Sequence, residues 1–423
     1  MELRINHNSI KTKNYLIHLY WILLLLIFVT SSIFQFQMIL FGGTAPIPMT
    51  VFRYGAVALV LLIIFTSRVK NMYVNKPLLT MWFLFVTYLF FEIIYWMSIG
   101  VGTPSELIKI ILFDQSYVFM FSIPLVMIIK DSVFEKPITI TILWSFVALS
   151  LLGIAQFIKK DPLIPTESAD GSFRSFSIFF GENVRAFSLF DSGYSFGHFL
   201  AVASSLIIFI NLKRKYKILL LSLALFATYA TLTRNTYIEV IVVILSSLIL
   251  KKTIKKRIVP YLIFFSNIIL GYLVINITPL LTLLTNNEDI FNTATYDSRV
   301  YWWNIVKGEW LNNGLISFLF GTGKTQGFGF DYVDNMYLTI AGQLGLLGLI
   351  FFFSLFLLMT RYVFKKARDN RTPLSMAICA FWTSFPVVSF FNISLPPYAI
   401  MFMILMIIMP FEKDTNVYRK GKS

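Results

Sequence analysis

The chain has 423 residues, of which 57% are hydrophobic and 13% are charged, and its formal net charge is +15. The mean hydropathy of +0.74 excludes a soluble domain with a polar surface. The single cysteine, Cys379, lies in an apolar run, so the chain has no internal disulfide framework and no cysteine-rich metal site. The basic residues form short clusters between apolar segments, which is typical of membrane topology and argues against a nucleic-acid-binding surface.

Apolar segments of near bilayer length predict an all-α polytopic membrane protein with about twelve transmembrane helices. We expect residues 1–423 to form a single integral membrane domain. The first apolar segment follows a basic N-terminus but is longer than the core of a signal peptide, so we expect it to be retained as a span. The predicted spans cover residues 16–40, 48–67, 78–99, 107–129, 138–158, 194–211, 217–233, 236–250, 258–277, 335–360, 374–391 and 396–411.

The loop charges predict the orientation of these spans. With the N-terminus in the cytoplasm, the inner segments collect about 26 Lys and Arg residues and the outer segments about 8. The inner clusters include "KRKYK" (213–217), "KKTIKKR" (251–257) and "RYVFKKARDNR" (361–371). Both termini are therefore expected in the cytoplasm.

Two predicted outer segments are too long to be simple connections: residues 159–193, and residues 278–333 before the tenth span. We expect function to reside there. In the second segment, Trp302, Ile305, Val306 and Trp310 recur at helical spacing. This pattern predicts either an interfacial helix with its aromatic rings at headgroup depth or a helix packed as a cap over the bundle.

The tenth span begins with a carboxylate beside a carboxamide, Asp334 and Asn335. On a straight helix Asp334 lies close in angle to Ala341, Gly345 and Gly348, so the acid would head a stripe of small residues that admits a neighbouring helix. Taken alone, the pair is better interpreted as a cap that satisfies free amides at the start of the helix.

Three arginines on the predicted outer face strengthen a functional interpretation. Arg234 stands between two short apolar runs, where a cation is costly unless it faces a cavity or a partner. Arg185 precedes a span and Arg299 lies in the long outer segment, and either could equally be a surface residue.

Other polar residues carry weaker signals. Glu92 and Asp114 lie within predicted spans and are either functional or paired inside the bundle, and His198 is expected to pack. No residues show the spacing of metal ligands, so we expect neither a metal nor another cofactor. "GTGKT" (321–325) lacks the first glycine of a phosphate-binding loop, and its glycines instead predict a tight turn.

In their order along the chain, these motifs resemble the superfamily of O-antigen ligases and Wzy-type O-antigen polymerases. In its ligases, a His-Asn pair at the end of the long outer loop is followed nine residues later by Gly-x-x-Gly. Here Asp334-Asn335 is followed at the same spacing by Gly345-Leu346-Leu347-Gly348, with Asp in place of His. The resemblance extends over most of the chain beyond residue 150 and includes Arg185 with "FSLF" and "FGHFLA", Arg234, Arg299 followed by Trp303, and "FGTGKTQGFGF".

The resemblance implies a GT-C-like membrane glycosyltransferase at the outer face of the bacterial cytoplasmic membrane. It would polymerise undecaprenyl-diphosphate-linked repeat units into capsule, exopolysaccharide or O-antigen, together with a flippase and a chain-length regulator. Asp334 would act as the base and Asn335 would orient the acceptor, while Arg185 and Arg234 would hold the diphosphate. Arg299 would hold the diphosphate or the glycan, and such cationic clamps can replace a metal.

Two other functions stay open from the sequence. A ligase-like transfer of the finished glycan uses the same motifs, although Asp334 in place of His favours the polymerase. A flippase or another transporter of lipid-linked oligosaccharide would have a similar number of spans, but the two long segments on one face argue against it. A structural membrane partner is a third possibility, which the embedded Arg234 disfavours.

Overall fold

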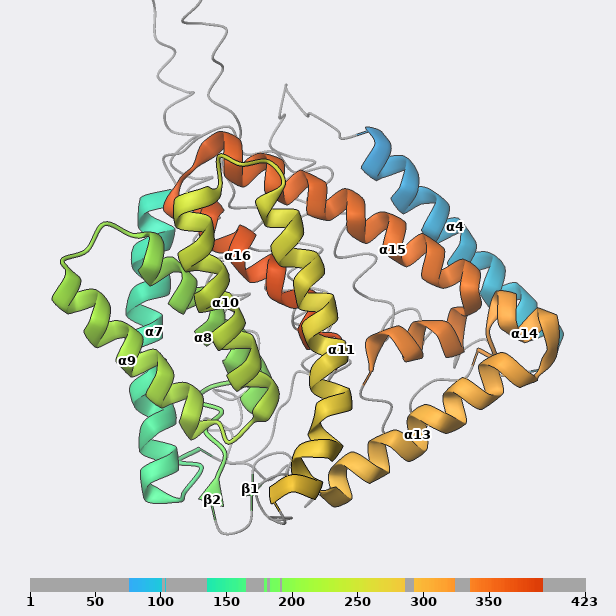
Figure 1. The fold of residues 1–423 in the computed structure, drawn as a ribbon, viewed down its shortest axis with the longest axis horizontal. Coiled ribbons are helices and arrows are strands. Elements are labelled where there is room, and N and C mark those ends of the chain that lie inside the picture. Colours follow the sequence, from blue (N-terminus) through green and yellow to red (C-terminus); the bar gives the residue numbers. More distant parts are fainter. Residues whose placement is uncertain are drawn as a thin grey trace, which may run out of the picture.

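The computed structural model describes residues 76–100, 103, 135–164, 179–180, 183–190, 192–285, 293–323 and 335–390. Over these residues the chain is predominantly helical (Figure 1). The helices are α4 (Lys76–Ser98), α7 (Glu135–Lys159), α8 (Gly193–Phe209), α9 (Arg214–Ala230), α10 (Arg234–Thr253), α11 (Val259–Thr285), α13 (Thr293–Asn312), α14 (Gly314–Phe320), α15 (Met336–Asn370) and α16 (Pro373–Val388). The strands β1 (Phe179–Phe180) and β2 (Asn183–Val184) form a short antiparallel pair.

The helices confirm an all-α fold with membrane character. Within the described residues, α4, α15 and the part of α7 from Ile142 to Lys159 are long and apolar enough to cross a membrane. Shorter apolar helices cover Gly193–Phe209, Val259–Leu273 and Pro373–Val388. Every predicted span within the described residues coincides with a helix, whereas those at 16–40, 48–67, 107–129 and 396–411 lie outside them.

Two helices are longer than the sequence pattern predicts. α11 continues to Thr285 and so enters the segment expected to be a loop from residue 278. α15 continues to Asn370, ten residues beyond the expected end at 360. In α15 the extension is basic, because hydropathy marks where apolar composition ends and not where backbone hydrogen bonding ends. In α11 the extension, TPLLTLLT, is still apolar, and the helix exceeds the length expected for a span.

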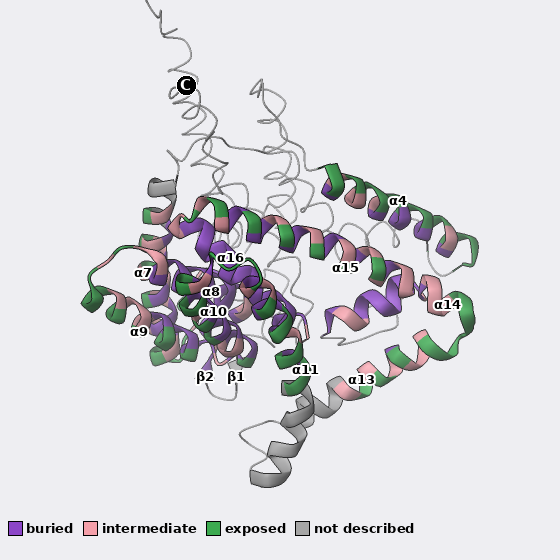
Figure 2. Cartoon of the chain, turned by 45° about the horizontal axis from the view of Figure 1, so that its top comes forward, coloured by how far each residue is buried: buried purple, intermediate pink, exposed green. Residues whose placement is uncertain are grey.

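α16 is the central helix of the core, and it is buried from Leu374 to Val388. Figure 2 shows it enclosed by the buried faces of α8 and α10. Its Trp382 stacks on Phe356 of α15 with ring centroids 4.5 Å apart and donates its indole N–H to the Thr360 hydroxyl at 2.9 Å. The tryptophan therefore packs and is also hydrogen-bonded, as a buried indole requires.

Polar side chains also join the helices inside this core. The Ser205 and Ser247 hydroxyls lie 2.8 Å apart and connect α8 to α10, and the Asn267 amide donates to the Thr383 carbonyl at 2.6 Å. Small hydroxyl side chains let helix backbones approach closely, and their hydrogen bonds replace those that water would make. The first bond thus joins α8 to α10, and the second joins α11 to α16.

α15 is broken at Gly345, which has φ 64° and ψ −165°. The break leaves the carbonyls of the preceding turn without their helical donors, and neighbouring segments supply replacements. The Tyr88 hydroxyl donates to the Leu344 carbonyl at 2.6 Å, and the Thr322 and Gly323 amides donate to the carbonyls of Gly342 and Gln343 at 2.8 and 3.2 Å. Non-helical backbone inside a membrane protein needs such partners.

The break corrects the expected stripe of small residues and explains part of the glycine-rich motif. Gly345 is not a surface for a straight helix to pack on, because its backbone departs from the helix and lies against Leu319 and Gly321. Gly321 and Gly323 both have positive φ, which confirms the predicted tight turn, and together with Thr322 they close the broken helix. Lys324 and Thr325 lie outside the described residues.

Candidate functional site

The backbone brings the Arg185 segment next to the turn before Arg234. The Ala186 amide donates to the carbonyl of Ala230, the last residue of α9, at 2.9 Å. Arg234 is the first residue of α10, four positions later, and it is exposed, whereas Arg185 is half-buried. Two guanidinium groups predicted to bind a diphosphate therefore originate from adjacent backbone segments, although they are 49 positions apart in the sequence.

Three threonines fix the turn that carries Arg234. The Thr231 hydroxyl donates to the Thr228 carbonyl at 2.7 Å and accepts the Thr233 amide at 3.3 Å, and the Thr233 hydroxyl donates to the Thr231 carbonyl at 2.8 Å. Threonine hydroxyls make such local bonds readily, and here they replace the helical bonds lost between α9 and α10. The start of α10 is thus held in one conformation.

A buried glutamine fixes the Arg185 side of the site. Gln156 of α7 accepts the Phe187 and Ser188 amides at 3.2 and 2.8 Å, and it donates to the carbonyls of Pro162 and Ser188 at 2.8 and 3.0 Å. Ser188 has a φ of 54°, so the chain turns sharply there. Sequence reasoning missed Gln156. Its signal was an amide in an apolar helix, which requires partners when it is buried.

Asn335 is the N-cap of α15, and its side chain accepts the Leu338 amide at 3.1 Å. This is the capping role expected from the sequence, and it uses the side-chain oxygen of Asn335. The Met336 amide donates to the Ser389 carbonyl at 2.9 Å, so the start of α15 is attached to the end of α16. Because the cap uses the side-chain oxygen of Asn335, its side-chain nitrogen is the atom that could orient an acceptor.

The end of α16 in turn packs on α10, one to two turns after Arg234. Val387 and Val388 share an apolar cluster with Ile238 and Val242. The β-strand pair lies at the bottom of Figure 1. The structure thus joins the Arg185 and Arg234 segments directly and links Asn335 to them through α16.

Two predicted site groups lie outside what the structure describes. Asp334 precedes the first described residue of α15. Arg299 belongs to α13, whose expected helical form is confirmed, but its side chain is not described. Val306 of α13 is buried beside Leu338 of α15, which favours the packed cap over a free interfacial helix for this face.

A buried histidine–glutamate contact joins α8 to α10, and its glutamate lies five residues after Arg234. His198 Nδ1 and Glu239 Oε2 are 2.7 Å apart, and the two residues are 2% and 1% exposed. Glu239 Oε1 has no hydrogen-bond partner among the described residues. The histidine is packed, as expected. Its acidic partner was missed, although a carboxylate in the apolar run of α10 was the signal for it.

Inside α4, Glu92 is fully buried and interacts with Tyr88 one helical turn away. Asp114 falls outside the described part of the chain. Among the described residues, no group of three His, Cys, Asp or Glu side chains could hold a metal ion. Glu92, His198, Glu239 and Lys366 are thus buried ionisable side chains within the described residues.

The sequence matches no protein-family model and no curated protein. The assignment of a function therefore depends on the chemistry of the residues themselves. The described residues establish a helical protein with membrane character, in which two arginine-bearing segments meet and a histidine–glutamate pair is buried.

Proposed function

We propose that the protein is a membrane glycosyltransferase that polymerises undecaprenyl-diphosphate-linked glycan repeat units at the outer face of the bacterial cytoplasmic membrane. The observation that carries the proposal is the hydrogen bond from Ala186 to Ala230, which holds Arg185 beside the turn that leads into Arg234. A leaving diphosphate develops negative charge as the glycosidic bond breaks. Fixed cations lower the energy of that state.

The proposed reaction is a glycosyl transfer. A hydroxyl of the acceptor sugar attacks the anomeric carbon of the donor chain, and the bond from that carbon to the phosphate oxygen breaks. The hydroxyl proton passes to the carboxylate of Asp334, and undecaprenyl diphosphate leaves with the bonding electrons. Arg185 and Arg234 bind the phosphate oxygens, and Arg299 holds the diphosphate or the glycan. The Asn335 amide nitrogen orients the acceptor.

Rigidity supports this role for the two arginine-bearing segments. The threonine hydrogen bonds hold the backbone just before Arg234, and Gln156 holds the backbone just after Arg185. A group that is already positioned costs less reorganisation when charge develops in the transition state.

The test is to replace Arg234 with alanine and with lysine in purified protein. The substrate is a synthetic undecaprenyl-diphosphate-linked repeat unit, and products are resolved on gels. We expect Arg234→Ala to lower the rate by about a hundredfold or more, as for loss of one transition-state donor. Arg234→Lys should recover part of the rate, because it restores the charge without the planar fork. Arg214→Ala, an exposed arginine at the start of α9, is the matched control.

Unchanged long chains from Arg234→Ala would remove this proposal. A product with a single added glycan block, in place of a ladder of lengths, would instead identify the ligase-like alternative.

The buried His198–Glu239 pair favours a second candidate, a transporter of lipid-linked oligosaccharide. Ionisable groups inside a membrane bundle often serve proton relays. A transporter cannot form a glycosidic bond. Polymer made in detergent solution, where no compartments exist, therefore separates the two candidates.

A further inference from the structure

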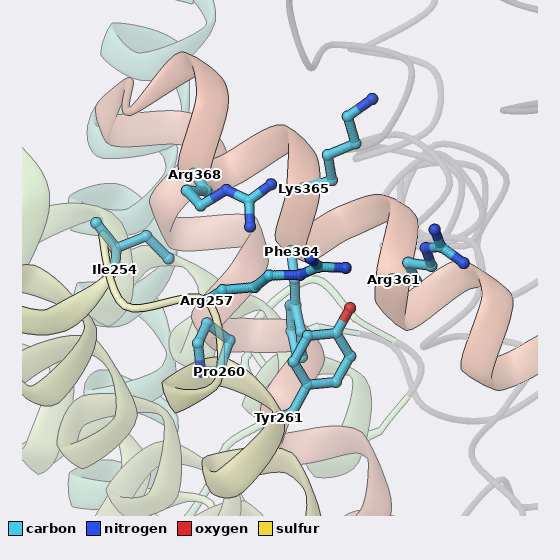
Figure 3. Close-up of a pocket in the computed structure, with 8 residues that line it drawn as sticks. All are labelled: Ile254, Arg257, Pro260, Tyr261, Arg361, Phe364, Lys365 and Arg368. Carbon is cyan, nitrogen blue, oxygen red and sulfur yellow. The ribbon is translucent and has the colours of Figure 1, made fainter.

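At the end of the bundle that carries α11's first turn and the last turns of α15, a hollow of about 210 Å³ opens to the surface (Figure 3). It is lined by Ile254, Arg257, Pro260, Tyr261, Arg361, Phe364, Lys365 and Arg368. Four of these eight residues are cations, and none is an acid. Loop charges predict that this end faces the cytoplasm, away from the site of the proposed transferase.

Helix geometry sets three of the cations around the hollow. Arg361, Lys365 and Arg368 follow one another at spacings of four and three residues, so they occupy one face of α15. The fourth, Arg257, comes from the connection between α10 and α11. In Figure 3 the guanidinium groups of Arg257 and Arg368 point toward the middle of the hollow, while Arg361 and Lys365 stand at its margin.

The floor of the hollow is aromatic and apolar. The rings of Tyr261 and Phe364 meet edge to face with centroids 5.0 Å apart, and Ile254 and Pro260 are buried beside them. This packing joins α11 to α15 and gives the cations a rigid base.

Among the described residues, one ion pair compensates these four cations. Arg368 Nε lies 3.4 Å from the neighbouring Asp369 carboxylate, and both side chains are about 30% exposed. Within the described residues, no carboxylate forms an ion pair with Arg257, Arg361 or Lys365. Like charges gathered in one hollow repel one another, so an anion bound among them relieves that repulsion.

Apolar surface runs from the cations along both helices. On α15, Ile350, Phe353 and Leu357 are exposed at helical spacing, and the same row ends at Arg361. On α11, Leu262, Phe265 and Ile269 are exposed in a second row that begins beside the hollow. A ligand with a phosphate at one end and hydrocarbon chains at the other can contact the cations and these rows together.

We propose that this hollow binds the phosphate headgroup of an anionic membrane phospholipid, with the acyl chains along the exposed rows of α11 and α15. Basic hollows between helices at the cytoplasmic side are suited to such headgroups. Arg257 and Arg368 bind the phosphate oxygens through their planar forks, and Arg361 and Lys365 add charge at the margin. The site does not depend on the proposed transferase activity.

The test compares the full-length protein with three double variants in nanodiscs of neutral phosphatidylcholine, with and without phosphatidylglycerol. Arg257→Gln with Arg368→Gln removes the two inner forks, and Arg257→Lys with Arg368→Lys keeps their charge. Lys255→Gln with Lys256→Gln also removes two positive charges, both from the connection that carries Arg257 but outside the hollow, and is the matched control. Lipid retention is measured by native mass spectrometry, and stability by thermal unfolding in each membrane.

We expect phosphatidylglycerol to be retained by the unaltered protein and to raise its unfolding temperature. The glutamine pair should weaken retention about tenfold or more, the lysine pair less, and the control pair least. All variants should unfold at the same temperature in neutral lipid, which shows that the fold is intact.

Three results would overturn the proposal. The first is equal loss in the hollow and control pairs, which would indicate diffuse surface charge. The second is retention that does not distinguish phosphatidylglycerol from phosphatidylcholine. The third is full stabilisation by millimolar inorganic phosphate in neutral nanodiscs, which would assign the hollow to a soluble anion.

Discussion

At the scale of single residues, Gly345 has the most constrained position in α15. Its φ is positive, a conformation that is strained for any residue with a side chain. An added Cβ would also clash with the backbone of Leu319 and Gly321. We therefore expect Gly345→Ala to lower the free energy of unfolding by more than about 2 kcal/mol. Gly308→Ala, in open helix on α13, should be neutral or slightly stabilising. Thermal unfolding in detergent distinguishes the two, and equal effects would contradict this account of the break.

Asn335 allows the structural and chemical roles of one residue to be separated. Its oxygen caps α15, and aspartate at this position keeps a capping oxygen while removing the amide nitrogen. Asn335→Asp should therefore preserve stability but reduce glycan transfer, whereas Asn335→Ala should also cost about 1 kcal/mol of stability. Unfolding temperatures and polymerisation rates of both variants test this. Full activity in Asn335→Asp would leave the residue as a cap only.

Prediction at the residue scale succeeded where a residue type has few possible roles. It failed where the role depends on a contact with a residue far away in the sequence. The positive φ of Gly321 and the cap at Asn335 could be predicted from residue type and local position. The partner of His198 could not, because Glu239 is 41 positions away and becomes adjacent only when α8 packs on α10. The same holds for Gln156 and the Ser188 turn.

At the scale of elements, α15 shows what hydropathy can predict. Its 35 residues would span about 52 Å as a straight helix, well over the hydrocarbon thickness of about 30 Å. The apolar part was predicted, and the basic last turns beyond residue 360 were not, because charged residues with high helix propensity continue a helix outside the membrane. The break was also missed, since Gly345 alone does not distinguish close packing from positive φ.

α13 yields a prediction about how an outer element is held. Val306 is 1% exposed and packs beside Leu338, whereas Tyr301 on the same helix is 62% exposed. Val306→Asp should detach α13 from α15, because it buries a carboxylate in an apolar cluster. We expect faster proteolysis of the detached segment, with Tyr301→Asp as the control. Equal cleavage of the two variants would mean that α13 is held by other contacts.

At the scale of the whole molecule, the arrangement of charge predicts an orientation that can be measured. Lys217 and Lys251 both donate to the carbonyl of Ile208 at 3.1 Å, so basic residues from α9 and α10 meet at the end of α8. The hollow in Figure 3 adds four more cations from α15 and the α10–α11 connection. We expect this basic end to lie in the cytoplasm.

Cysteine labelling provides the measurement, because Cys379 is buried and is the chain's single cysteine. After Cys379→Ala, a Lys307→Cys variant on α13 should react with an impermeant maleimide in intact spheroplasts. A Lys255→Cys variant at the basic end should react only after the membrane is opened. The reverse labelling pattern would show that the protein has the opposite orientation, with the proposed transferase site on the cytoplasmic face.

Most of the architecture follows from composition, but the relations between distant segments do not. Helices and their order could be predicted from apolar length, because a bilayer imposes one secondary structure on each span. The Arg185 and Arg234 segments meet through the hydrogen bond from Ala186 to Ala230, which hydrophobic periodicity in the sequence cannot predict. Asp334 as a base and the diphosphate as a ligand stay predictions.

The hydrogen bonds across the break in α15 also link the first arm of α15 to the segment that follows α14. The Thr322 and Gly323 amides bind the turn before Gly345, so the segment that follows α14 and the first arm of α15 are held to one another. That arm begins just after its N-cap Asn335, and the Met336 amide ties it to the Ser389 carbonyl at the end of α16. A load on α14 would therefore be transmitted through the first arm of α15 to the centre of the core.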